Sequence, residues 1–382
     1  MKKAFVYADN AATTRVADEV LAAMVPYFSS LYGNPSAAYG FAGLAAEGVE
    51  HARAQVAGAL GAAPGEVFFT SGGTEADNWA LKSGARLRSA RGRHIISTAI
   101  EHHAVLHSLE ALAEEGFEVT LLPVDPDGLL RLEDLERALR DDTILVSCMF
   151  ANNEIGTVQP VAEIGALCRA RDILFHTDAV QAVGHLPIDV VAMNIDLLAL
   201  SGHKFHAPKG VGALYVRRGI DLPPFVDGGK QERGRRAGTE AVPAIVGLGA
   251  AAELATAHFE REAARVAALR DRLLKGILAQ VPGARLNGHP TRRLPGNLNL
   301  SFSGVEGPSL LALLDSRGIC AAAGSACTAG ASAPSHVLTA IGLDAQTAQG
   351  SLRLSFAGDS TEEDVDTLLE LLPPLIARLR AL

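Results

Sequence analysis

Short apolar runs alternate with amphipathic segments through the first two thirds of the chain. Helix-like stretches such as "GTEADNWALKSGARL" and "EHHAVLHSLEALAEEG" follow several of these runs. Unbroken apolar strands that alternate with amphipathic helices indicate a mainly parallel sheet with both faces covered. We therefore predict an α/β fold, with strands over 66–71, 93–99, 143–150, 173–179, 195–201 and 212–216.

The pattern changes after residue 240. An alanine-rich segment over 244–280 predicts one long helix that bridges two domains. Beyond it, "NLNLSF" and "SLRLSF" predict strands and the last 20 residues predict a helix. A chain of 382 residues fits a large domain plus a smaller α+β domain. We expect the large domain over 13–258 and the small C-terminal domain over 259–382, joined by the N-terminal segment 1–12.

Composition excludes several classes of protein. With 48% hydrophobic and 20% charged residues the chain can form a packed core. The net charge of −9 argues against general affinity for nucleic acid or acidic membranes, although "KQERGRR" is locally basic and suggests an anion or subunit contact. Four cysteines do not make a disulfide framework, and no signal peptide or apolar run of about 18 residues is evident. These features predict a cytoplasmic protein without a nucleic-acid or membrane partner.

Polar residues gather where the predicted strands end, which is where ligands bind in open α/β sheets. The segment "TSGGTE" leaves a strand and opens a helix, so its backbone N–H groups can attract an anion. The alternative is that Ser71 or Thr74 is an ordinary helix cap. When this segment is considered by itself, the cap is the favoured interpretation. The spacing is neither a Walker loop nor GxGxxG, so it gives no support for ATP or NAD.

The stretch "LLALSGHKFHAPKG" places Lys204 at the mouth of a buried strand. A lysine that forms a Schiff base needs a partly dry cleft, because desolvation frees its amine. Ser201 and His203 beside it can bind phosphate, and Asp178 at the end of another strand can pair with a ring nitrogen. An amine, an acid and phosphate donors are the groups that pyridoxal phosphate requires.

Histidines near residue 102 have different expected roles. His102 lies at a strand–helix junction, where it can stack on a planar ligand. His103 and His107 have an i, i+4 spacing that can chelate zinc, but no HExxH pattern accompanies them. A structural role is favoured for that pair, and no resident metal is predicted.

With these motifs the chain resembles the cysteine desulfurases of the NifS/IscS type. They belong to the class V aminotransferase group of fold-type I pyridoxal-phosphate enzymes. The resemblance runs almost end to end, and the motifs occur in the same order. They are "DNAATT", "GNPS", "FTSGGTEADN", "EHHAV", "NNEIGTVQP", "HTDAVQAVG", "SGHKFHAPKG", "ERGRRAGTE" and "GSACTAG".

The resemblance implies a role for each matched residue. Lys204 would carry the cofactor, Asp178 would pair with its ring nitrogen, and Gln181 would bond its ring hydroxyl. His102 would stack on the ring and take part in catalysis. Phosphate contacts would come from Gly73, Thr74, Ser201 and His203, with Thr239 reaching in from the other subunit of a homodimer. Asn153 and Arg353 would contact the cofactor or the substrate carboxylate, and Cys327 would be the nucleophile.

The implied reaction converts L-cysteine to L-alanine and leaves a persulfide on Cys327. The sulfur would pass to an acceptor protein, such as a scaffold for iron–sulfur cluster assembly, or to a thiolation relay. Cys327 would ligate a cluster only when such a scaffold is bound. A selenocysteine lyase or another class V aminotransferase is the alternative, although an aminotransferase has no use for a thiol at 327. A catalytically silent scaffold is a third reading, which the complete set of site residues makes improbable.

The sequence around Cys327 lacks a hydrophobic period and strong helix signals. It predicts a mobile surface loop over 324–338, matching the longer-loop branch of the family, which implies delivery to a partner protein. Tyr39 departs from the family, whose members often have histidine there, and 356–363 lacks the usual Gly-Arg. The other cysteines, Cys148, Cys168 and Cys320, are expected to be buried filler.

Overall fold

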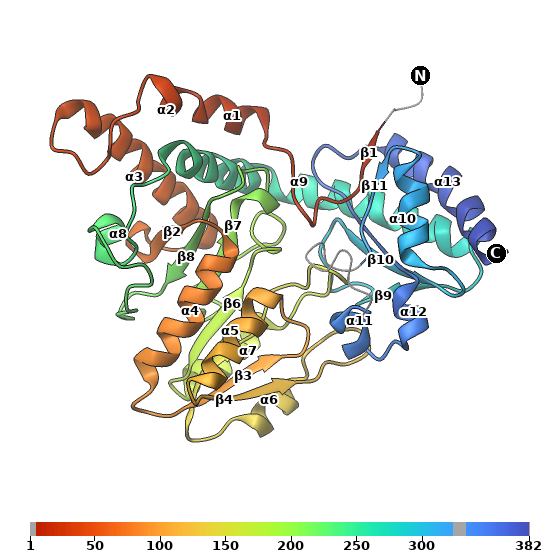
Figure 1. The fold of residues 1–382 in the computed structure, drawn as a ribbon, viewed down its shortest axis with the longest axis horizontal. Helices are drawn as coiled ribbons and strands as arrows, with labels where there is room; N and C mark the ends of the chain where they lie inside the picture. The colour runs from red at the N-terminus through yellow and green to blue at the C-terminus, as the bar shows by residue number, and fades with distance from the viewer. Residues whose placement is uncertain (1–4, 324–333, 382) are drawn as a thin grey trace.

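The computed structural model describes residues 5–323 and 334–381 of the chain (Figure 1). Its centre is a seven-stranded sheet in the order β2-β8-β7-β6-β5-β3-β4. The five strands from β7 to β4 are parallel, and β8 pairs antiparallel with both β7 and β2. The strands are β2 (Val67–Thr70), β3 (His94–Thr98), β4 (Glu118–Leu122), β5 (Thr143–Ser147), β6 (Leu174–Asp178), β7 (Leu197–Ser201) and β8 (Gly212–Val216).

Helices cover both faces of this sheet, as the unbroken apolar strands predict. Leu197 and Ala199 of β7 point into the apolar cluster beneath α4 (Gly73–Arg88) and α5 (His103–Glu114). Leu198 and Leu200 point the other way, into a second cluster. That cluster is covered by α1 (Asp18–Met24), α3 (Gly40–Leu60), α6 (Leu132–Ala138), α7 (Val161–Ala170) and the first half of α9 (Val242–Gln280). The predicted α/β class is therefore confirmed.

Figure 1 shows α9 running from the large domain into the smaller one. Its residues up to Ala252 pack on the sheet, whereas residues from Val266 onward pack on a separate core. The predicted boundary at 258/259 falls inside this helix, between its two packing segments. The smaller unit contains β9 (Ala284–Asn287), β10 (Asn297–Phe302), β12 (Ser351–Ser355), α10 (Gly307–Asp315), α11 (His336–Ala340), α12 (Ala345–Gln349) and α13 (Glu362–Arg380).

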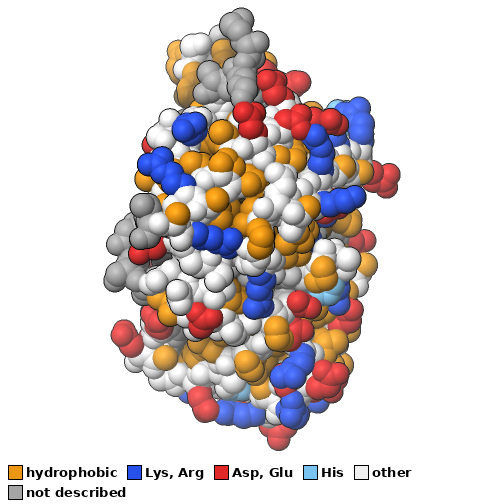
Figure 2. Space-filling view, turned by 90° about the vertical axis from the view of Figure 1, so that its right-hand side faces the viewer, with side chains coloured by type: hydrophobic (Ala, Val, Ile, Leu, Met, Phe, Trp, Pro, Cys, Tyr) orange, Lys and Arg blue, Asp and Glu red, His pale blue; other side chains and the backbone are white. Residues whose placement is uncertain are grey.

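The N-terminal segment joins the two units. Its strand β1 (Val6–Tyr7) pairs in parallel with β11 (Ile319–Cys320), and Val6 lies in the core of the smaller unit. Four short helical elements complete the fold of the described residues: α2 (Pro26–Ser29), α8 (Gln231–Gly234), and 3-10 turns over Pro64–Glu66 and Gly202–Lys204. Figure 2 shows the molecule from the side of the smaller unit. On this face, charged side chains of both signs surround an apolar area.

The expectation that no apolar segment is long enough to span a membrane is wrong for one helix. By length and composition alone, α9 contains such a stretch. Its buried residues, which include Ile245, Leu248 and Leu273, belong to the two protein cores. A helix that packs in a protein core can have the same length and composition, so these two features do not identify α9 as a membrane span.

Candidate active site

A pocket of about 220 Å³ lies beyond the carboxyl ends of the parallel strands. Ten of the residues that the sequence singled out line it: Gly73, Thr74, His102, Asn153, Asp178, Gln181, Ser201, His203, Lys204 and Arg353. The lining also includes residues that sequence reasoning missed: Ala11, Ala12, Asp77, Met149, Ala151 and Val180. Asp77 could have been noticed as a charged residue between Ala76 and Trp79 on the apolar side of α4.

Lys204 enters this pocket from the 3-10 turn that follows β7. Its Nζ donates to the backbone oxygens of Ala11 and Ala12, at 2.7 Å and 2.8 Å. Its own backbone oxygen lies 2.9 Å from Nε2 of His185. The DNAATT segment therefore holds the amine at the pocket wall, although that segment is remote in sequence.

Asp178 ends β6 and is only 5% exposed. One carboxylate oxygen accepts the N–H of Val180 at 2.9 Å. Burial raises the pKa of Asp178, while His102, this hydrogen bond and Lys204 oppose the rise. A cationic ring nitrogen beside the carboxylate would favour its ionised form further.

His102 caps the start of α5. Its Nδ1 accepts the N–H of Ala104 at 3.1 Å, which places a ring proton on Nε2 when the ring is neutral. Burial is the main cause that lowers the pKa of His102. His102 lines the pocket, where a neutral ring can stack on a planar ligand.

The start of α4 is the candidate anion-binding end of the pocket, because a helix start presents backbone N–H groups. Gly72 precedes the helix, and within the described chain neither Ser71 nor Thr74 caps it with a side chain, so the capping alternative is not seen. A Cβ on Gly73 would lie 2.5 Å from Cγ2 of Val180, so only glycine fits this close approach. A neighbouring hollow of about 350 Å³ is lined by this helix end together with His203 and other residues. Burial lowers the pKa of His203 to about 4, so the ring is neutral and can donate one hydrogen bond.

Arg353 on β12 reaches the pocket from the smaller unit and is 1% exposed. It donates to Oδ1 of Asp9 at 2.8 Å and to the backbone oxygen of Asn153 at 3.2 Å. Its Nε is buried and has no hydrogen-bond partner among the described residues. A carboxylate ligand in the pocket would complete this donor set.

Two predicted residues are not among those that line the pocket in the described part of the chain. Thr239 does not line the pocket within its own chain, and Cys327 lies outside the described residues. The segment before Thr239 is anchored by a buried ion pair, in which Arg53 and Glu232 approach to 2.8 Å. Arg236 pairs at 2.8 Å with Glu75 in the first turn of α4, which brings this basic segment near the anion-binding end.

Burial disfavours the thiolate form of the other three cysteines, which is the form that acts as a nucleophile. Cys148 and Cys168 are fully buried, and burial raises the pKa of Cys168 to about 12 and that of Cys148 well above its usual range. Cys320 on β11 is partly exposed, so the expectation of buried filler is wrong for it. Burial is the main cause that raises its pKa as well.

Three histidine rings lie close together beside the pocket: His103 stacks on His107 and is tilted against His336. The ring centres of His103 lie 5.1 Å from those of His107 and 4.9 Å from those of His336. Across residues 5–323 and 334–381, no three His, Cys, Asp or Glu side chains converge to hold a metal ion.

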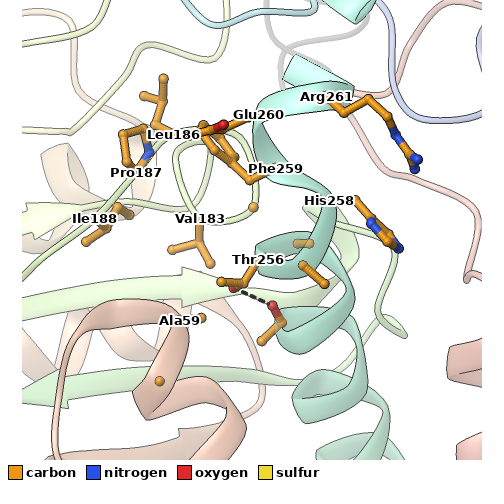
Figure 3. A pocket seen from close by; sticks show the side chains of 15 residues that line it. Ala59, Val183, Leu186, Pro187, Ile188, Thr256, His258, Phe259, Glu260 and Arg261 are labelled. Atoms are coloured by element: carbon orange, nitrogen blue, oxygen red, sulfur yellow. Dashed lines mark hydrogen bonds between the residues drawn. The ribbon is translucent and has the colours of Figure 1, made fainter. Parts of the chain in front are cut away.

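A larger hollow of about 620 Å³ lies away from these residues, between the end of α3, residues 183–188 and α9. Figure 3 shows His258 and Arg261 turned away from Val183 and Ile188. The hydroxyl of Thr256 donates to the backbone oxygen of Ala252 at 2.8 Å. Because its polar side chains do not converge, this hollow lacks the chemistry of the strand-end pocket.

Comparison with known proteins agrees with this geometry. Residues 6–368 match the family model "Aminotransferase class-V", and the chain belongs to that family. It is 54% identical over 375 residues to a cysteine desulfurase IscS of Methanosarcina thermophila, covering 98% of this chain and 93% of that one. Among solved structures, a NifS-like protein superposes with a TM-score of 0.92 at 41% identity, covering 98% of this chain and all of the other. A structure described as SspA in complex with cysteine gives a TM-score of 0.82 at 40% identity, covering 93% of this chain and 100% of that one.

Class V aminotransferases and their cysteine desulfurase relatives are pyridoxal-phosphate enzymes. The residues of the pocket fit this cofactor. Lys204 supplies an amine, Asp178 a buried carboxylate, and the open end of α4 a set of N–H donors beside Ser201 and His203. The close approach at Gly73 leaves the room that a phosphate needs at a helix start.

Proposed function

We propose that this chain is a cysteine desulfurase, which converts L-cysteine to L-alanine and stores the sulfur as a persulfide on Cys327. The observation that carries the proposal is the convergence of ten predicted residues, from both structural units, on one pocket. The identity to cysteine desulfurases over almost the whole chain supports it.

Pyridoxal phosphate, when bound, supplies an electron sink that stabilises the negative charge left when the substrate loses its Cα proton. Lys204 would hold it covalently, and Asp178, Gln181 and His102 would hold its ring. The N–H groups at the start of α4, with Ser201 and His203, would hold its phosphate. Asn153 contributes a backbone oxygen that orients Arg353.

The protein residues then move protons and sulfur. Arg353 binds the substrate carboxylate, which fixes the orientation of the Cα–H bond. The Lys204 amine, once released, accepts the Cα proton. The Cys327 thiolate attacks the substrate sulfur, so a new S–S bond forms while the C–S bond breaks and leaves its electron pair on Cβ. Cβ then takes up a proton, the Lys204 amine returns a proton to Cα, and alanine leaves. An ordinary thiol has a pKa of roughly 8.5, so local charge or a histidine must activate it.

The first test locates the cofactor and the product. Borohydride reduction of the protein with pyridoxal phosphate, followed by peptide mapping, should find the label on Lys204. Lys209 lines the neighbouring hollow and is the matched control, so Lys209→Ala should still be labelled at Lys204. A label on Lys209 or Lys230 would remove Lys204 from its role. Equal amounts of alanine and persulfide should form from L-cysteine, and selenocysteine assayed in parallel distinguishes a lyase for that substrate.

The protein is proposed to act as a homodimer in which Thr239 reaches the partner's phosphate site. Large apolar side chains are exposed along α1, α2 and the start of α3: Leu21, Val25, Phe28, Tyr32, Tyr39, Phe41 and Leu44. Their combined exposure is unusual for a monomer surface and is typical of a subunit interface. Mixed dimers of Lys204→Ala and Thr239→Ala subunits should recover activity that neither parent has. Full activity in a monomer at high dilution would refute this arrangement.

The sulfur acceptor is proposed to be a cytoplasmic protein, such as a scaffold for iron–sulfur cluster assembly, or a thiolation relay. Incubation of the 35S-persulfidated enzyme with cytosolic extract, followed by capture of the enzyme, should transfer label to a protein bound to it. Label that leaves only as free sulfide would contradict delivery to a protein. Fractionation of cells should recover the enzyme with the cytosol and not with membranes.

A further inference from the structure

A row of polar side chains lies behind the pocket, between the sheet and α4. Leu174, His176 and Asp178 alternate along β6, so they point to the same face. Leu174 packs in the apolar cluster that contains Ala76 and Trp79 of α4. His176 and Asp178 therefore face α4, at the level where Asp77 projects from that helix.

The row is almost completely buried. Asp77 is 1% exposed, His176 0% and Asp178 5%. Ser147 on the adjoining strand β5 is also fully buried, and its Oγ lies 2.9 Å from Nδ1 of His176. The other ring nitrogen of His176, Nε2, lies 3.4 Å from Oδ1 of Asp77. A continuous path thus runs from Ser147 through His176 to Asp77, which lines the cofactor pocket together with Asp178.

Two atoms in this row require a proton between them. Oδ1 of Asp77 and Nε2 of His176 are both buried, and neither has another hydrogen-bond partner among the described residues. Unpartnered buried polar atoms are rare in folded proteins, because each costs desolvation energy that nothing returns. Since the two atoms face each other, one shared proton satisfies both.

The surroundings decide which residue holds that proton. Burial, followed by the negative charge of Asp178, raises the pKa of Asp77 well above its usual range. Burial lowers the pKa of His176 to about 3. A protonated Asp77 would then face Nε2 of a neutral His176 at 3.4 Å, and Nδ1–H of that ring would donate to Oγ of Ser147.

We propose that His176 is a positioning residue for Asp178: it binds the proton of Asp77 and so prevents Asp77 from sharing that proton with Asp178. Asp178 then remains the one ionised carboxylate that faces the ring nitrogen of the cofactor. The inference rests on the proposed function, since it assigns Asp178 to that nitrogen. The alternative is a buried polar pair that only packs α4 against the sheet.

The experiment removes the acceptor of the proton. In His176→Leu the protonated carboxyl group of Asp77 loses its hydrogen-bond acceptor. It should then share its proton with the carboxylate of Asp178, because two neighbouring carboxyl groups share one proton. Affinity for pyridoxal phosphate should fall roughly 10- to 100-fold, because a charge-assisted hydrogen bond is lost. Affinity for 1-deazapyridoxal phosphate, which has carbon in place of the ring nitrogen, should not change. A merely structural role predicts an equal loss for both compounds and would overturn the proposal.

A second substitution should reverse the effect. In Asp77→Leu/His176→Leu no proton competes for Asp178, so the preference for pyridoxal phosphate over the deaza compound should return to the wild-type ratio. Asp77→Leu alone should keep that ratio, which still decides the question if His176→Leu does not fold. A fall of the ratio in Asp77→Leu, or no recovery in the double variant, would refute the proposal. Thr177→Val is the matched control, because Thr177 is buried on the opposite face of β6 and should leave the ratio unchanged.

The outcomes separate this inference from the proposed function. A wild-type protein that binds neither compound at Lys204 would contradict the proposed function. A wild-type protein that prefers pyridoxal phosphate, with a His176→Leu variant that prefers it equally, would contradict only the role of the Asp77–His176 pair.

Discussion

Replacing Glu101 by glutamine should change how the stability of the protein depends on pH. Glu101 is fully buried after β3, and one of its carboxylate oxygens accepts the hydroxyl of Thr98 at 2.6 Å and the N–H of Met149 at 2.9 Å. The other oxygen, Oε2, has no partner among the described residues. Burial therefore raises the pKa of Glu101 from 4.5 to about 8, although the two hydrogen bonds oppose the rise.

The sign of the effect follows from where the proton resides. Between the unfolded value of 4.5 and the folded value of about 8, the folded protein keeps a proton that the unfolded chain releases. The stabilisation from this group is complete below the lower value and is lost as the pH rises through about 8. The slope approaches 1.4 kcal/mol per pH unit, so roughly 3 kcal/mol of unfolding free energy is lost over about two units.

The assay is urea unfolding of the cofactor-free full chain between pH 5.5 and 7.5. It is followed by fluorescence of Trp79, the only tryptophan, at one protein concentration. Glu101→Gln should cost about 1 kcal/mol at the acid end, because a neutral amide replaces a neutral acid. The difference between wild type and variant should then shrink and reverse as the pH rises. Glu110→Gln, at an exposed position on α5, is the control and should follow the wild type. A Glu101→Gln curve parallel to the wild-type curve would refute the assignment of a neutral Glu101.

Two further predictions concern packing. Arg53→Ala should lower the free energy of unfolding by about 3–5 kcal/mol, because it leaves the nearly buried Glu232 unpaired. Arg15→Ala breaks an exposed pair and should leave the free energy of unfolding almost unchanged, so equal losses for the two variants in chemical denaturation would contradict this account. Gly73→Ala should destabilise by roughly 1–3 kcal/mol, since its Cβ would meet a side-chain methyl at 2.5 Å. Gly43→Ala has open space and should stabilise by about 0.5–1 kcal/mol, and a thermal shift in the same direction for both glycines would be the contrary result.

The sequence predicted the interior strands of the sheet because they are buried on both faces and read as apolar runs. It did not predict β4, whose residues Glu118–Leu122 are mostly exposed or half-buried at the sheet edge and lack such a run. The helices α1 and α2 are short, and their apolar side chains are exposed, so they carry little periodic signal.

The candidate site was predictable where chemistry and position coincide. Lys204, Asp178 and His102 follow strands, so the topology of an open sheet brings them together. Asp77 was missed because it lies inside a helix, where a carboxylate normally faces water. The backbone oxygens of Ala11 and Ala12 that hold Lys204 depend on a contact across about 190 residues of sequence, which no local pattern encodes.

One measurement tests the central claim most directly: a single turnover of Cys327→Ser with L-cysteine in the presence of pyridoxal phosphate. The variant should bind the cofactor as tightly as the wild type and change its absorbance when L-cysteine is added, yet release almost no alanine and hold no persulfide. Wild-type protein in the same experiment should release one alanine and gain one persulfide sulfur per site. A Cys327→Ser variant that releases alanine at the wild-type rate would remove Cys327 from the reaction and show that sulfur leaves as sulfide instead.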